Sequence, residues 1–405
     1  MINASEALHI ILEHTQLLGT EKVPLADTLG RTCAKNISAD VDLPSFDNSA
    51  MDGYALLSSD VKAASPNTPV TLAVVGESSA GNSFDGVVEP GESVRIMTGG
   101  MIPRGADSVV PLESVRLLSE DKIECAEAGP VGMHIRARGE DIKEGEIVLR
   151  EGEVIRPPHM GILAALGITK LRVGRRPLVN ILSTGDELVE IDEKPGEGQI
   201  RNSSASALAG YIALAGGTAR FLGIVPDRKR RIRKKIEEAL DADIVIVTGG
   251  VSVGKYDFVA EALADLEVHI LFSKVNIKPG RPLVFGRRRK TLVFGLPGNP
   301  VSTGVTFLQF VRPAILAMQG RTDVLPVRYA AILQSAITKT DGKRHYLRGV
   351  ATPLEGVLRV RTTGTQSSGV LNSLARANCL IIVPEQVRQV NEGETVDIEF
   401  VHQDP

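Results

Sequence analysis

The sequence predicts a multidomain α/β plus β protein, with a central doubly wound α/β domain, an inserted N-terminal β module and a small C-terminal β-barrel. Residues 174–322 alternate apolar, strand-like runs with helical segments, which is typical of a parallel sheet covered by helices. Residues 44–131 and 323–405 carry short strand-like runs between Gly, Pro and polar turns. A chain of 405 residues is long enough for about two to four domains.

The N-terminal part of the chain is predicted to hold two domains. Residues 2–17 have the pattern of an amphipathic helix and lack the basic start and cleavage site of a signal peptide. We expect this helix to belong to a connecting domain made of residues 1–43 and 132–173, which ends in a short apolar helix. The β module, residues 44–131, would be inserted between these two segments.

The order of the predicted elements defines two further domains. They are the α/β domain, 174–322, and the C-terminal β domain, 323–405. Strands of the α/β domain are predicted at 178–185, 219–225, 243–250 and 269–275, and as a pair around a basic turn in 283–298. Its helices are predicted at 204–217, 227–241, 256–266 and 300–320. Because ligands of doubly wound domains bind at the carboxyl ends of the strands, we expect the site there.

Charge and composition exclude several functions. The formal net charge is −3 and only 4% of the residues are aromatic, with no Trp, so nucleic-acid binding is not expected. The basic run 228–235 fits the solvated face of a helix. No run reaches about 18 apolar residues, so we expect a cytoplasmic protein without a membrane span. Cys33, Cys125 and Cys379 lie far apart and are predicted to be buried free thiols.

One Gly-rich turn comes close to a phosphate-binding P-loop. Residues 248–258, TGGVSVGKYDF, place Gly249, Gly254 and Lys255 at the G-x-x-x-x-G-K spacing. A P-loop needs a Ser or Thr hydroxyl next, to bind Mg²⁺, whereas this chain has Tyr256, so hydrolysis of a nucleoside triphosphate is not expected. Amides at a strand–turn–helix junction still favour an anion, although a turn without a ligand fits the same residues.

Acidic side chains follow three of the predicted strands. Asp186 and Glu187 come after the first strand of the α/β domain, Asp227 after the second and Asp257 after the third. Each alone would also fit a helix cap. Together at one sheet edge they would repel each other, which favours a cation or hydrogen-bond donors between them.

Lysines and free amides are predicted in the next two loops. Lys274 and Lys278 precede a Pro-Gly turn, and Pro300 fits the first position of a helix, where its missing N–H costs nothing. The N–H groups that follow could hold an oxyanion. A salt bridge or a cap would explain each feature singly. Together with the acids, they favour a site for a large phosphorylated ligand, a small oxyanion and a divalent metal.

Seven motifs give the chain a resemblance to the molybdopterin molybdenumtransferase family, which includes bacterial MoeA and the C-terminal part of gephyrin. They are SFDNSAMDGYA, IMTGG with PRGADSVV, RARGEDI, STGDEL, TGGVSVG-x-x-D, NIKPGRP and FGLPGNPVS. They occur in the family's order over essentially the whole chain. The resemblance implies that the central domain is a molybdopterin-binding domain similar to MoaB and Mog.

The resemblance also implies an activity: insertion of molybdate into the dithiolene of adenylyl-molybdopterin, assisted by Mg²⁺, with release of AMP. It implies a homodimer whose site lies between the α/β and C-terminal domains of one subunit and the β module of the other. Transient contacts with a molybdopterin adenylyltransferase and with cofactor-accepting enzymes are expected. Molybdate is a dianion, so Lys, Arg and N–H donors suit it.

Site residues are carried over from the family's motifs. The implied catalytic acids are Asp52, Asp141, Glu187, Asp227 and Asp257, of which Asp227 and Asp257 are also the implied Mg²⁺ ligands. The implied substrate-binding residues are Thr98, Arg136, Gly249, Gly250, Ser252, Lys274, Lys278, Pro297 and Pro300. YLRG and GTQSSG imply that Arg348 and Ser368 contact molybdate. Lys255 and Ser204 depart from the family pattern, which leaves the position of the metal open.

Two other functions are compatible with parts of the sequence. Adenylation of molybdopterin by ATP would need only the α/β domain, so the β module and the barrel argue against it. A non-catalytic molybdopterin-binding scaffold, as in the gephyrin resemblance, is disfavoured because all five acids are present and no long disordered linker is visible. The sequence does not distinguish molybdate from tungstate as the oxyanion.

Overall fold

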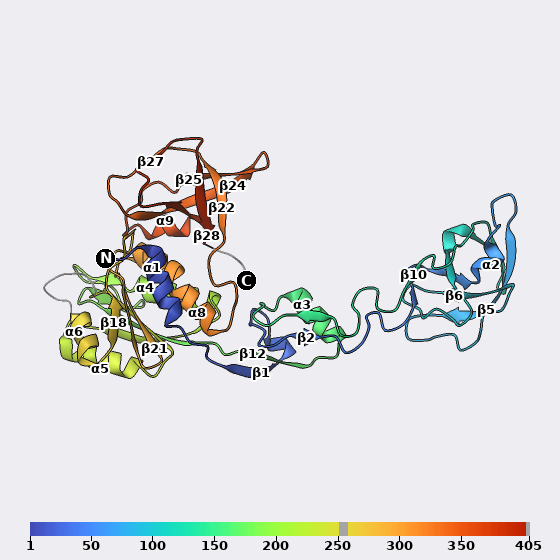
Figure 1. Cartoon of the computed structure of the whole chain (residues 1–405), viewed down its shortest axis with the longest axis horizontal. Coiled ribbons are helices and arrows are strands. Elements are labelled where there is room, and N and C mark those ends of the chain that lie inside the picture. Colours follow the sequence, from blue (N-terminus) through green and yellow to red (C-terminus); the bar gives the residue numbers. More distant parts are fainter. Residues whose placement is uncertain (251–257, 402–405) are drawn as a thin grey trace. The chain divides into compact units, whose positions relative to one another are not determined.

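The computed structural model describes residues 1–250 and 258–401, and the chain divides into two compact units. The first unit consists of Met1–Lys35, Glu151–Pro157 and Lys170–Pro405. The second consists of Asn36–Arg150 and Pro158–Thr169. The first unit thus holds both the α/β domain and the C-terminal β domain (Figure 1). The four-domain division with the boundaries given above stays a prediction.

A six-stranded sheet forms the centre of the first unit. Its strands lie in the order β16 (Thr218–Val225), β13 (Leu178–Thr184), β17 (Ile244–Thr248), β21 (Thr291–Leu296), β20 (Val284–Arg288) and β18 (His269–Phe272). The first four strands are parallel, and β20 and β18 are each antiparallel to their neighbours. The predicted doubly wound domain is confirmed, and the strand pair around the basic turn adds an antiparallel edge to it.

Helices cover both faces of this sheet. In Figure 1, α5 (Lys229–Ala239) and α6 (Phe258–Asp265) lie on one side, and α1 (Ala4–Glu13), α4 (Ser203–Leu214) and α8 (Arg312–Met318) lie on the other. Alternate residues of β17 enter the two cores: Ile244 and Ile246 enter one, and Val245 and Val247 the other. A strand buried on both faces is a continuous apolar run, which is why the sequence pattern predicted it.

The helix α1 is shorter than the predicted segment 2–17. Asn3 caps its start, because the Asn3 side chain accepts a hydrogen bond from the Glu6 N–H at 2.8 Å. At the other end the His14 ring bonds to the Ile10 carbonyl at 2.8 Å. After His14 the backbone is no longer helical, and the Leu18 N–H donates to the Met318 carbonyl at the end of α8.

One helix in the described part of the chain is long and apolar enough to cross a membrane, by length and composition alone. It is Pro300–Met318, formed by α7 (Pro300–Thr306), a π-helical turn (Phe307–Val311) and α8. Within the protein, however, 83% of its apolar window is buried. This helix is therefore packed as a core element of the first unit.

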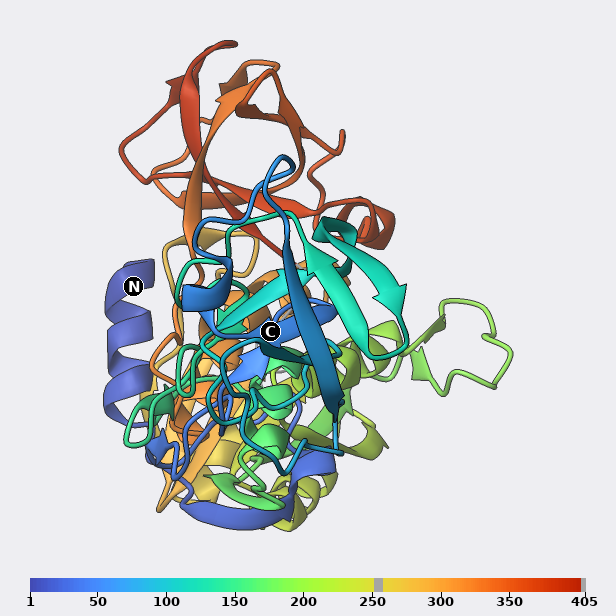
Figure 2. The ribbon, with the colours of Figure 1, turned by 90° about the vertical axis from the view of Figure 1, so that its right-hand side faces the viewer.

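The C-terminal domain is a closed five-stranded barrel, as predicted. Its ring runs β24 (Arg344–Leu354), β25 (Val357–Thr362), β22 (Arg328–Leu333), β28 (Thr395–Phe400), β26 (Cys379–Val383) and back to β24. Figure 2 shows these orange and red strands curving around one another. A short strand of the α/β domain, β19 (Ile277–Lys278), pairs with β24 and so links the barrel to the sheet.

The second unit contains the predicted β module. Its six-stranded sheet has the order β7 (Ser108–Pro111), β4 (Gly53–Leu56), β6 (Glu92–Ile96), β5 (Val70–Ser78), β9 (Lys122–Cys125) and β8 (Val115–Ser119). Two-stranded ribbons join β2 (Ile37–Ser38) to β11 (Ile147–Leu149) and β3 (Asn48–Ser49) to β10 (Ile135–Arg136). Another ribbon, in the first unit, joins β1 (Thr20–Pro24) to β12 (Lys170–Gly174). The helices are α2 (Ser58–Val61) and α3 (Pro157–Ala165).

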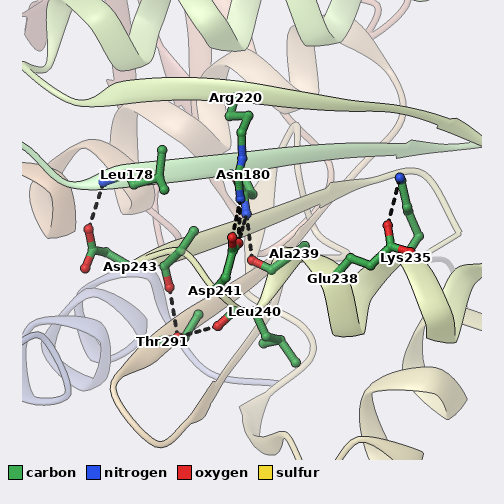
Figure 3. Close-up of polar contacts among 11 residues, drawn as sticks. Leu178, Asn180, Arg220, Lys235, Glu238, Ala239, Leu240, Asp241, Asp243 and Thr291 are labelled. Atoms are coloured by element: carbon green, nitrogen blue, oxygen red, sulfur yellow. Dashed lines mark hydrogen bonds and ion pairs between the residues drawn. The ribbon is translucent and has the colours of Figure 1, made fainter.

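Polar groups close the amino-terminal edge of the central sheet (Figure 3). The fully buried Asn180 donates to the Ala239 carbonyl and to Asp241, both at 2.8 Å, and its side-chain oxygen accepts from Arg220 at 2.8 Å. Asp243 accepts from the Leu178 N–H at 2.8 Å. The hydrogen-bonding capacity of these groups is used within the protein. This edge of the sheet is therefore structural, and the opposite edge is the candidate for binding a ligand.

Candidate functional site

A pocket of about 370 Å³ lies at the carboxyl ends of the parallel strands, where the sequence predicted the site. Thr184 at the end of β13 and Thr248 at the end of β17 line it, together with the loop before α7. Five residues assigned to the site from the sequence also line it: Glu187, Gly249, Gly250, Pro297 and Pro300. The volume is in the range of small-ligand pockets, about 300–1,000 Å³.

Two glycines bring the turn after β17 close to the end of β13. Gly249 and Gly250 have φ angles of +84° and +61°. A Cβ on Gly249 would lie 2.3 Å from the carbonyl oxygen of Thr184, and one on Gly250 would lie 2.8 Å from a methyl group of Val259. Only glycine fits this left-handed, close approach. The Gly249 N–H donates to the Leu296 carbonyl at 3.2 Å, so this amide is engaged within the protein. Ser252 and Asp257 lie outside the described residues.

A buried polar network forms part of the pocket's wall. The Ser183 hydroxyl accepts two hydrogen bonds, one from the Asn202 side chain at 2.9 Å and one from the Thr248 hydroxyl at 3.0 Å. Asn202 also caps α4 by accepting from the Ala205 N–H at 3.2 Å. These bonds hold the start of α4 against two strand ends. No sequence motif assigned Asn202 or its neighbours to the site, although Asn and Ser before an apolar helical run are a cap signal.

Acids from two strand ends come together. The Asp227 N–H donates to the carboxylate of Asp186 at 3.1 Å. Burial raises the pKa of Asp227, and the charges of Asp186 and Glu187 raise it further. Repulsion among these carboxylates is what the sequence pattern predicted at this edge.

The acids suit Mg²⁺ in one specific way. Within residues 1–250 and 258–401, no three His, Cys, Asp or Glu side chains are grouped so as to hold a metal. Mg²⁺ commonly uses only one or two carboxylates and completes its shell with water and substrate phosphates. Burial is the main reason for the raised pKa of Asp227, and the charges of Asp186 and Glu187, which a cation would offset, add to it. Asp227 therefore fits as one such ligand.

Lys278 lies beside an acid that the sequence analysis did not assign. Its ammonium group is 3.8 Å from a carboxylate oxygen of Asp341, and the His345 ring lies 2.6 Å from the other oxygen. Burial alone would raise the pKa of Asp341, but the His345 hydrogen bond and nearby charges, including Lys343, lower it to about 2. Asp341 is distant in the sequence, and no motif signals the contact. Lys274 is half-buried in the preceding loop.

Arg348 and Ser368 occupy different positions relative to the pocket. The Ser368 hydroxyl accepts from Asn299, a pocket residue, at 3.1 Å, and its carbonyl accepts from the Val301 N–H at 3.3 Å. Arg348 is fully buried and donates to Ser373 and to the Ser367 carbonyl at 3.1 Å, while its Nη1 has no partner within the described part of the chain. Burial lowers its pKa to about 10. In this arrangement Arg348 supports the loop that carries Ser368.

Four site residues belong to the second unit and are described within it alone. The backbone N–H and the hydroxyl of Thr98 both donate to one oxygen of Asp52, at 2.7 and 2.8 Å, and hold the pKa of Asp52 below its usual value. Arg136 is exposed on β10, opposite Asn48. Asp141 is also exposed, with its N–H bonded to the Leu43 carbonyl. Thus the unit brings Asp52 and Thr98 together.

Family profiles match the chain in three consecutive parts. They are described as the MoeA N-terminal region (domains I and II) for residues 2–167, a probable molybdopterin binding domain for 180–317, and the MoeA C-terminal region (domain IV) for 330–401. The pocket at the strand ends is lined by residues of the second of these parts.

Relatives of known name cover the whole chain. A molybdopterin molybdenumtransferase of Haemophilus influenzae is 38% identical over 383 residues, 94% of this chain and 93% of the relative. One from Bacillus subtilis is 33% identical, over 100% of this chain and 95% of the relative. The crystal structure of the molybdopterin biosynthesis moeA protein from Pyrococcus horikoshii OT3 matches with a TM-score of 0.85 at 33% identity, over 99% of this chain and 100% of that one. The chain therefore belongs to the molybdopterin molybdenumtransferase family of enzymes.

Proposed function

We propose that this protein inserts molybdate into adenylyl-molybdopterin. The two dithiolene thiols of the pterin would bind molybdenum, and one oxygen of molybdate would leave as water with their protons. A second water would cleave the phosphoanhydride, so that AMP leaves and molybdenum cofactor forms. The observation that carries the proposal is the pocket at the strand ends, lined by Glu187 and by the glycines of the turn after β17, in a chain of this family. No nucleophilic side chain is required, because the sulfurs of the substrate themselves bind molybdenum.

The residues of the first unit would divide the work by charge. Lys274 and Lys278 would hold the phosphate and molybdate groups, since ammonium groups donate to dianions. Glu187 and Asp227 would accept from the donor groups of the substrate. Pro300 opens α7, where N–H groups suit an oxyanion, and Ser368 would place its hydroxyl beside them. Arg348 would act on molybdate through the loop that it supports.

Mg²⁺ would be held by Asp227 and Asp257, with water and substrate phosphate as its other ligands. The ion would supply charge neutralisation at the phosphoanhydride. Gly249 and Gly250 would shape the turn that borders this position, and Ser252, which lies outside the described residues, is proposed to contact the substrate. We also propose that Pro297 keeps the loop before α7 open, since its ring blocks a hydrogen bond to the strand.

We further propose a cytoplasmic homodimer. In it Asp52, Thr98, Arg136 and Asp141, all from the second unit, would complete the site of the partner subunit. Such an enzyme would exchange its ligands with a molybdopterin adenylyltransferase and with cofactor-accepting enzymes through transient contacts.

A reconstituted reaction tests the proposed function. Purified protein with adenylyl-molybdopterin, molybdate and Mg²⁺ should release AMP and yield a product that activates a molybdenum-free reductase. Omitting molybdate should abolish reductase activation. Adenylate formation from molybdopterin and ATP would instead identify an adenylyltransferase, and tight binding of adenylyl-molybdopterin without AMP release would identify a scaffold.

A further inference from the structure

The first unit contains a second pocket that shares no lining residue with the one at the strand ends. Its volume is about 550 Å³, within the usual range for small-ligand sites. It lies where α4, the π-helical turn and α8 meet the strands β22 and β28 of the barrel. No residue assigned to the proposed reaction lines it.

The guanidinium group of Arg312, at the start of α8, is a cation of this pocket. Arg312 lines the pocket, and among the described residues it makes neither a hydrogen bond nor an ion pair. The other charged groups nearby are already paired. Arg321 donates two hydrogen bonds to Asp323, at 2.8 and 2.6 Å, and Glu399 accepts from Gln309 at 2.7 Å. Arg312 is therefore the donor left for an anion.

The walls of the pocket are aromatic and aliphatic. Tyr211 stacks on Phe307 with ring centres 5.5 Å apart, and Tyr329 meets Phe400 edge to face at 5.3 Å. The exposed Leu214 lies on the same lining. Flat apolar surfaces of this kind bind the ring of a ligand, while a guanidinium fork binds its carboxylate or phosphate.

The guanidinium is also poorly solvated. Burial and the charge of Arg321 lower the pKa of Arg312. The charges of Asp323 and Glu399 in the same lining raise it, but their carboxylates are bonded to Arg321, Gln309 and Arg328. A cation that has lost part of its water gains more from an anion than an exposed arginine does.

We propose that this second pocket binds a small aromatic molecule with one anionic group, seated with its ring between Tyr211 and Tyr329 and its anion on Arg312. The site is independent of the proposed reaction, because it uses none of the residues assigned there.

Calorimetric titration of the full chain with 2-naphthyl phosphate, and with neutral 2-naphthol as its matched partner, tests the proposal. We expect one molecule per chain, with the phosphate bound at least about tenfold more tightly than the naphthol. Arg312→Gln should weaken the phosphate by about 10- to 100-fold and leave the naphthol unchanged.

Three other variants make the test specific. Arg230→Gln, on the exposed face of α5, and Lys278→Gln, at a residue assigned to the proposed reaction, should leave both affinities as they are. Val327→Trp, at the exposed rim of the second pocket, should reduce both by filling its mouth. This variant keeps the test decisive if Arg312→Gln does not fold.

Equal affinity for the two probes would overturn the proposal, as would an Arg312→Gln chain that binds the phosphate normally. Loss of binding in Lys278→Gln would place the ligand in the first pocket and would also overturn it. None of these titrations depends on turnover, so a failure of the proposed reaction leaves their outcome readable.

Discussion

A single missing Cβ at Gly249 sets the distance between two loops of the first pocket. Its φ of +84° and the carbonyl of Thr184, 2.3 Å from where a Cβ would lie, are separate constraints. Gly393 has the same φ of +84° but nothing within 4 Å of its Cβ position. Comparing alanine substitutions at Gly249 and Gly393 therefore distinguishes the cost of the left-handed backbone from the cost of the steric clash.

We expect Gly249→Ala to lower the free energy of unfolding by about 3 kcal/mol or more, and Gly393→Ala by only about 1 kcal/mol, because only the first adds a clash to the left-handed strain. Urea unfolding measures both. An equal decrease in the free energy of unfolding in the two variants would show that the clash with Thr184 adds nothing to the cost.

At Asp227 we expect function and stability to move in opposite directions. Its pKa is raised, so the folded state favours the protonated acid, and the ionised form at neutral pH costs stability. Asp227→Ala and Asp227→Asn should each reduce cofactor formation by about 100-fold or more. Asp227→Asn should melt at or above the wild-type temperature, because the repulsion with Asp186 and Glu187 is gone.

Cofactor assays and thermal melting check this prediction, with the exposed Asp192→Asn as the control. A mutant that makes cofactor normally at ordinary molybdate concentrations would remove Asp227 from the proposed site. A large drop in melting temperature would contradict the repulsion described above.

At the scale of elements, the pairing of β19 with β24 joins the α/β domain to the barrel. Lys278 stands opposite His345 in this pairing, and both contact Asp341. The pKa of Asp341 is raised by burial but is held low by the His345 hydrogen bond and by Lys343, both in the C-terminal domain. Its ionised form stabilises the fold above its ordinary value of 3.8, and this contribution is lost as the pH falls to about 2.

We expect Asp341→Asn to remove part of the acid sensitivity of the fold. Wild-type stability, measured by urea unfolding, should fall more steeply between about pH 4 and pH 2 than that of the variant. Asp397→Asn, an exposed acid on β28 of the same barrel, should keep the wild-type slope. A wild-type slope in Asp341→Asn as well would assign the acid sensitivity to other groups.

At the scale of the whole molecule, the proposed homodimer makes a prediction about mixed subunits. Asp52 belongs to the second unit and Asp227 to the first. In the proposed homodimer, each site combines Asp227 of one subunit with Asp52 of the other. Asp52→Ala and Asp227→Ala should each be inactive alone.

When the two variants are unfolded and refolded together, we expect about a quarter of wild-type activity, since half of the dimers would be mixed and each would hold one intact site. Sedimentation should give twice the chain mass of 43.2 kDa. A monomer, or a mixture that stays inactive, would contradict the shared site.

The sequence by itself determined the elements and the sheet edge where the first pocket lies. The strand β17, buried on both faces, appears in it as a continuous apolar run, and the basic run on α5 alternates with buried Ile232 and Ile236. Such patterns are local and repeat with the period of the element, so they are readable without a partner. The three cysteines are free and buried, as predicted.

Tertiary structure alone decided which distant groups meet. Asp341 reaches Lys278, Asn299 reaches Ser368, and Arg348 is buried behind the loop that it was expected to share with a ligand. Arg312 belongs to no motif, and only the placement of the neighbouring acids shows that it has no partner among residues 1–250 and 258–401. Contacts of this kind depend on how helices and barrel pack, and no local period in the sequence encodes them.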